Sequence, residues 1–111
     1  MLVVTFSAEG QDNCVTVGDV PYVYARTPEG SFVMPARCRH RGGPLHLATR
    51  DGDRGRLVCP WHGRITPVSR LMRQVPAVRR GNVVTAVLPD EPEATCALEH
   101  RPMSEDLSYR R

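Results

Sequence analysis

Short segments that alternate apolar and polar residues make up most of the chain. The clearest is GNVVTAVL at residues 81–88, which is rich in β-branched side chains and ends before Pro89, as strands often do. LVVTF at residues 2–6 is a similar segment, and CVTVGDVPYVYAR at 14–26 alternates well enough for one or two strands with a bend at Gly18–Asp19. Strands this short and this closely spaced predict a small all-β sandwich or barrel.

Turn residues separate these segments from a second group of short strands. TPEG at residues 27–30 has proline and glycine where a hairpin turn favours them. GRLV at 55–58 is expected to form a short strand, RITPV at 64–68 follows the next loop, and QVPA at 74–77 is a proline-bearing loop. The chain shows no internal repeat and no heptad pattern.

The composition favours many turns over long helices. The chain has 111 residues, which suits one domain with a modest core. Glycine occurs 9 times and proline 10 times, while only 5% of the residues are aromatic. A bound metal centre would help to stabilise so small a core.

Residues 89–111 differ in character from the rest of the chain. They contain six acidic residues, and prolines at positions 89, 92 and 102. We expect an appended acidic tail in which Pro92 opens a short helix through about Glu99. The remainder of this segment is expected to be disordered. The alternative is that its negative charge folds over the basic segment and gates docking.

The charge is distributed unevenly. All 15 basic residues are arginine, and the net charge is +3. Residues 26–80 carry twelve arginines against three acidic residues, a net charge of +9, while 1–25 and 81–111 each carry −3. The basic region is either an ordinary solvated surface or a docking face for an acidic partner. No stripe of interleaved aromatic residues supports nucleic-acid binding.

Two Cys/His pairs carry the candidate chemistry. Cys38 and His40 form a Cys-x-His pair, and Cys59 and His62 form a Cys-x-x-His pair. Thiolate suits iron–sulfur clusters, zinc or copper(I), and imidazole suits zinc, iron and copper. In an extended chain, residues two apart point the same way with Cα atoms about 6–7 Å apart. Each pair is therefore able to serve two neighbouring metals, although the same four donors also suit one tetrahedral zinc ion.

Glycines follow both pairs, at Gly42, Gly43 and Gly63. Glycine adopts positive φ and permits close backbone approach, so loop amides are able to point at the sulfur atoms of a cluster. A site that binds zinc alone has less need of such amide donors, so the glycines favour a cluster.

The other cysteines and histidines have simpler interpretations. Cys14 and Cys96 are expected to be small buried side chains or inert exposed ones, and His46 and His100 are expected at the surface. No run of 18 apolar residues is present, and the first ten residues lack the basic start and apolar core of a secretory signal. We expect a cytoplasmic protein with reduced thiols and no association with a membrane.

The two motifs, CRHRGGPL at 38–45 and CPWHG at 59–63, resemble the Rieske [2Fe–2S] domain. The likeness covers roughly residues 13–88. It implies one [2Fe–2S] cluster and an all-β fold of three small antiparallel sheets, with a two-loop cluster-binding subdomain. The domain would span 1–88, its cluster-binding subdomain about 36–78, and the tail 89–111.

The resemblance also implies roles for individual residues. Cys38 and Cys59 would hold the inner iron, and His40 and His62 the outer iron near the surface. Pro76 would lie in the loop that covers the cluster. Trp61 is expected to pack beneath its loop, with a role in docking or electron transfer as the alternative.

Departures from the family pattern indicate a branch. Rieske proteins of respiratory complexes carry a disulfide between the loops and a Ser and a Tyr that hydrogen-bond the cluster, whereas the matching places here are Gly43, Trp61 and Arg64. Fewer donors imply a potential toward the lower end of the roughly −150 to +300 mV Rieske range, as in the ferredoxin and oxygenase branch. Nearby Arg39, Arg41 and Arg64 would favour the more negative reduced cluster and offset part of that drop.

The expected function is therefore one-electron transfer. With His40 and His62 used as ligands, only His46 and His100 remain for the two-histidine, one-carboxylate iron site of an oxygenase. His46 lies inside the cluster-binding subdomain and His100 in the tail, and the chain has no room for the separate catalytic domain of such an enzyme, so we expect a carrier rather than an enzyme. A Rieske-type ferredoxin would pass electrons from a flavin-dependent reductase to an oxygenase or similar enzyme. Alternatives are a small subunit of a larger redox complex, nitrite-reductase-like or a split oxygenase, and a structural zinc module. The expected docking side chains lie beside the ligands: Arg37, Arg39, Arg41 and Arg64.

Overall fold

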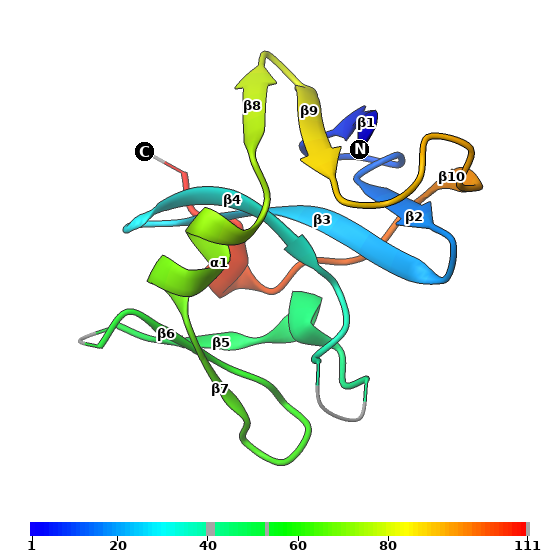
Figure 1. The fold of residues 1–111 in the computed structure, drawn as a ribbon. Coiled ribbons are helices and arrows are strands. Elements are labelled where there is room, and N and C mark those ends of the chain that lie inside the picture. Colours follow the sequence, from blue (N-terminus) through cyan, green and yellow to red (C-terminus); the bar gives the residue numbers. More distant parts are fainter. Residues whose placement is uncertain (40–41, 53, 111) are drawn as a thin grey trace.

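Three small antiparallel sheets form successive layers in the computed structural model, which describes residues 1–39, 42–52 and 54–110 (Figure 1). One outer sheet has the order β1 (Leu2–Ser7), β9 (Val83–Leu88), β8 (Ala77–Arg80). The central sheet has the order β10 (Cys96–Glu99), β2 (Cys14–Val17), β3 (Val20–Thr27), β4 (Gly30–Pro35). The other outer sheet has the order β5 (Thr49–Asp51), β6 (Arg56–Val58), β7 (Ile65–Pro67). The predicted all-β fold of three small antiparallel sheets is confirmed.

The central sheet separates two apolar cores. Along β3 every second residue is buried, as a strand in a layered fold requires. Val23 and Ala25 face the core next to the β5–β6–β7 sheet, whereas Val15 of β2 faces the core next to the β1–β9–β8 sheet. Cys38 and Cys59 belong to the first of these cores. The candidate ligand loops are therefore anchored in packed apolar structure.

Most predicted strands and turns are present. The strands expected at residues 2–6, 14–26 and 81–88 correspond to β1, the β2–β3 pair and β9. The bend at Gly18–Asp19 joins β2 to β3, and Gly18 has a φ of 62°, a value that glycine adopts without strain. TPEG forms the β3–β4 hairpin, in which Thr27 faces Gly30.

Helix α1, Val68–Gln74, was not predicted. Its residues Leu, Met, Arg and Gln favour helix, and Val68 and Leu71 bury its inner face. The helix ends at Val75, which is extended because the residue before a proline avoids the helical region. The outer face of α1, including Arg70 and Gln74, is left exposed. In the described part of the chain, no helix is long and apolar enough to cross a membrane.

The C-terminal segment is an integral part of the fold, so the expectation of a disordered tail is wrong. Residues 96–99 form strand β10 rather than a helix, because pairing with β2 supplies backbone partners to what would otherwise be a sheet edge. Leu107 lies in the short 3₁₀ turn Glu105–Leu107 and is only 1% exposed. The side chain of Asn13 donates to the Arg101 carbonyl at 2.7 Å and accepts from the Arg101 N–H at 2.8 Å.

Candidate metal centre

The two candidate ligand loops share one backbone design. The N–H of Cys38 donates to the carbonyl of Gly43 at 2.6 Å, and the N–H of Cys59 donates to the carbonyl of Arg64 at 2.8 Å. Each loop is thus closed by a bond from its cysteine to the residue five positions later. The residue four positions after each cysteine is a glycine in the left-handed region, Gly42 with φ 67° and Gly63 with φ 61°. This repeated geometry explains why glycine follows both Cys/His pairs.

Gly43 brings the two loops together. A Cβ atom at this position would lie 2.8 Å from the sulfur of Cys59 and 2.9 Å from the Cβ of Trp61. Real side chains do not approach so closely, so this position requires glycine. The first loop therefore packs directly on the thiol of the second.

The two thiols are buried neighbours. Cys59 is 1% exposed, and burial raises the pKa of its thiol, partly offset by the backbone N–H of Trp61, while nearby Cys38 raises the pKa further. A metal would have to displace the thiol protons, because thiolate is the ligating form. An amide that already points at the Cys59 sulfur is the kind of donor that stabilises ligated sulfur.

His62 lies at the opposite, exposed end of its loop. Its φ of 64° is unusual for a residue with a side chain, and Gly63 continues in the same region. Two successive left-handed residues reverse the chain sharply and leave the imidazole at the surface. His40 and Arg41, predicted as a ligand and its neighbour, lie outside the described residues. In the described ranges, no three His, Cys, Asp or Glu side chains are arranged to hold one metal ion.

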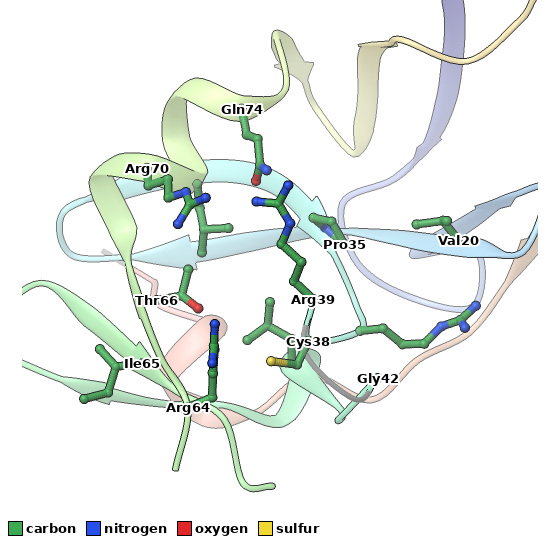
Figure 2. A pocket seen from close by; sticks show the side chains of 13 residues that line it. Val20, Pro35, Cys38, Arg39, Gly42, Arg64, Ile65, Thr66, Arg70 and Gln74 are labelled. Atoms are coloured by element: carbon green, nitrogen blue, oxygen red, sulfur yellow. The ribbon is translucent and has the colours of Figure 1, made fainter. Parts of the chain in front are cut away.

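A cavity of about 440 Å³ adjoins Cys38, between the first loop, the start of β7 and helix α1 (Figure 2). Arg70 and Gln74 of α1 line it, and sequence reasoning missed both because the helix was not predicted. The helix-forming run RLMRQ was the available signal. The remaining lining residues are Val20, Pro35, Arg37, Cys38, Arg39, Gly42, Leu45, Arg64, Ile65, Thr66 and Leu71.

The other residues predicted around the site fall into two groups. Arg37, Arg39 and Arg64 are exposed and line the cavity. Pro76, predicted to cover the cluster, lies between α1 and β8, where its carbonyl accepts the Val87 N–H at 2.9 Å. It does not line the cavity, whereas residues of α1 do.

Two sequence expectations are corrected. Trp61, expected beneath its loop, is 52% exposed, because its Cβ packs on Gly43 while the ring extends outward. His46, expected at the surface, is buried, with its Nδ1 atom 2.7 Å from the carbonyl oxygen of Pro102. The C-terminal segment covers it, which the expected disordered tail would not have done.

The remaining candidates behave as expected. His100 is exposed and its Nδ1 atom lies 2.9 Å from the Gly10 carbonyl oxygen. Cys14 is buried and Cys96 is exposed, and both are free thiols.

The donor set fits a binuclear iron–sulfur centre. Two buried thiols face each other beneath loops with glycine turns, and the described histidine lies further out, so sulfur and nitrogen donors are separated as two different irons require. Gly43 allows the two loops to pack this closely, because a side chain at that position would clash with the Cys59 sulfur.

Comparisons with known proteins agree with this chemistry. The family model described as the Rieske [2Fe-2S] domain matches residues 3–87. A human "Rieske domain-containing protein" is 55% identical over 31 residues, 26% of this chain and 20% of that protein, so the match spans about a fifth of the relative's length. No solved structure matches the chain. The chain belongs to the Rieske [2Fe-2S] domain family, whose members bind a [2Fe–2S] cluster and serve in electron transfer.

Proposed function

We propose that this protein is a one-electron carrier, a Rieske-type ferredoxin of the ferredoxin and oxygenase branch. Cys38 and Cys59 hold the inner iron, and His40 and His62 hold the outer iron. The cluster supplies one-electron redox chemistry, and the chain binds it, shields it and sets its potential. The observation that carries the proposal is the pair of loops with buried thiols at one end and exposed His62 at the other.

This polarity suits electron exchange with another protein. The buried Cys38 and Cys59 would shield their side of a bound cluster from water, while the exposed His62 would present its side to a docked partner. The half-exposed ring of Trp61 lies in the same loop as His62, and aromatic side chains are favoured contacts at interfaces.

The proposed partners are acidic proteins, a flavin-dependent reductase as donor and an oxygenase or similar enzyme as acceptor. Arg37, Arg39 and Arg64 are exposed, and Arg41 belongs to the same set by sequence. Contacts of this kind steer association and dissociate quickly, and salt weakens them. A cytoplasmic location suits such partners and the two thiols that the cluster would not use, Cys14 and Cys96.

The ligand assignment is tested by replacing both histidines. Protein with His40→Ala and His62→Ala is expected to lose the visible absorption and the EPR signal of the chemically reduced cluster. The matched control is His100→Ala, which removes an exposed histidine outside both loops. Retention of an unchanged spectrum by the double variant would show that the assignment is wrong. One zinc per chain with no acid-labile sulfide would instead support the zinc module.

The carrier role is tested by partner binding. A diffusing carrier is expected to be reduced by a flavin-dependent reductase at a rate that falls as salt is raised. Stoichiometric purification with a large redox protein, surviving high salt, would contradict the carrier role and favour the fixed-subunit alternative.

A further inference from the structure

We propose that the cavity beside Cys38 binds a small organic carboxylate with an apolar body, and that it binds this anion more tightly when the protein is oxidised. The second half of this inference rests on the proposed function, because it requires the cluster. The first half concerns the side chains of the cavity alone.

The cavity has the size and the apolar wall of a ligand site. Its volume of about 440 Å³ falls within the range of roughly 300–1,000 Å³ that small-molecule sites occupy. Leu45 and Leu71 are buried at its base, and Val20, Pro35 and Ile65 add apolar surface. Inorganic phosphate would leave this wall uncovered, whereas an apolar body would cover it.

Polar groups around the wall select an anion. Four arginines line the cavity, and its remaining polar side chains are Thr66 and Gln74. None of these arginines takes part in an ion pair found among the described residues. Guanidinium groups bind carboxylates through paired hydrogen bonds, and one bound anion also relieves repulsion among neighbouring cations. The four arginines are Arg37, Arg39, Arg64 and Arg70.

Helix α1 supplies one complete side of the site. Arg70 and Gln74 are four positions apart and therefore lie on one face of the helix, and Figure 2 shows both side chains at the cavity beside Arg39. Leu71 turns its side chain into the core and fixes the helix there. Arg73 is on the same helix and is exposed, but it does not line the cavity. Arg70, which lines the cavity, and Arg73, which does not, therefore form a matched pair for a test.

The position of the cavity couples anion binding to the redox state. Among the proposed ligands that the structure describes, Cys38 lines the cavity, whereas Cys59 and His62 do not, so a ligand bound there would lie beside a single ligand of the cluster. Reduction adds one negative charge close to the bound carboxylate. By linkage, the oxidised protein binds the anion more tightly and the anion lowers the reduction potential.

Calorimetric titration of the cluster-loaded, oxidised protein with three probes tests the binding. The first probe, cyclohexanecarboxylate, carries both a negative charge and an apolar ring. Acetate carries the charge without the ring, and cyclohexanecarboxamide carries the ring without the charge. Cyclohexanecarboxylate is expected to bind at least tenfold more tightly than either of the others. Arg70→Gln is expected to weaken that binding at least fivefold, and Arg73→Gln less than twofold.

Equal binding of cyclohexanecarboxylate and acetate, or equal losses in the two arginine variants, would overturn the binding site. The redox half is measured by mediated spectroelectrochemistry with and without saturating cyclohexanecarboxylate. A tenfold preference for the oxidised form corresponds to a potential lower by 59 mV. An unchanged or raised potential would overturn the coupling. A preparation without cluster would overturn the proposed function and the coupling, while the same titration would still decide the binding site.

Discussion

The cluster-binding subdomain has two contrasting sides, which differ in how their polar groups are satisfied. On one side lies the C-terminal seam, residues 101–109. There the Ser104 hydroxyl donates to the Ala48 carbonyl at 2.6 Å, and the N–H of Arg50 donates to the Asp106 carboxylate at 2.8 Å. The partners are far apart in sequence and each group has its own counterpart, so this side is built for stability.

On the other side lies the cavity face, formed by the side chains that line the cavity beside Cys38. Arg39, Arg64 and Arg70 leave their guanidinium groups in solvent, although acidic residues are available elsewhere in the chain. Like charges left together lower stability slightly. The seam therefore holds the subdomain in place, whereas the cavity face carries exposed arginines that form no ion pair found among the described residues. Such a face suits the partner and the ligand proposed above.

Loss of the metal centre is the largest expected effect. Cys59→Ser removes a thiolate that is buried against the first loop, and we expect almost complete loss of visible absorption and labile sulfide. Cys96→Ser is the control, because Cys96 is exposed on β10. Normal cluster content in the Cys59 variant would show that the loop thiols are not ligands.

Truncating the seam is expected to have the next largest effect. Leu107→Ala removes a side chain that is 1% exposed in the core shared with Cys38 and Cys59, which costs about 2–4 kcal/mol of unfolding free energy. Urea unfolding followed by circular dichroism measures the loss. Leu98→Ala is the control, because Leu98 is 51% exposed. Equal stability of the two variants would mean that the C-terminal segment does not support the subdomain.

The same contrast explains what sequence alone could predict. The ligand loops and the strands follow from local signals, namely Cys/His spacing, glycines and the alternation of apolar residues. The seam depends on contacts such as Asn13 with Arg101 and His46 with Pro102, whose partners are far apart in the chain. Prolines and acidic residues gave 89–111 the composition of a disordered tail, and single apolar residues such as Leu107 were too sparse to contradict it.

Helix α1 was missed for a related reason. It has only seven residues, and isolated helices of that length are not stable. Packing of Val68 and Leu71 on the core stabilises it, and no pattern within so short a segment reveals this tertiary contact. The cavity could not be predicted either, since its walls come from four separate segments of the chain.

Reversing one charge on the cavity face is expected to have an intermediate effect on partner reduction. Arg37→Glu places an acid beside the first loop and is expected to slow reduction by an acidic reductase at least fivefold at low salt. The difference should shrink as salt screens it. Arg80→Glu, in the outer sheet, carries the same charge change and is the control. Equal slowing in both variants, measured by stopped-flow absorbance, would assign the effect to net charge rather than to the cavity face.

The smallest expected effect concerns alkaline stability and the thiol of Cys14, which lies in the same core as Leu107. Burial raises the pKa of the Cys14 thiol, and the charge of Glu99 raises it further. As pH rises past the ordinary thiol pKa of 9.0, the unfolded chain releases this proton before the folded chain does, so stability is lost with rising pH. The Cys14→Ala variant has no thiol at this position, so it should not lose stability in this way. Its unfolding free energy, measured by urea titration, should therefore improve relative to the parent protein between pH 8 and pH 10, whereas that of Cys96→Ala, which changes an exposed thiol, should not. A pH-independent difference for Cys14→Ala would show that the buried thiol does not titrate differently in the folded and unfolded chains.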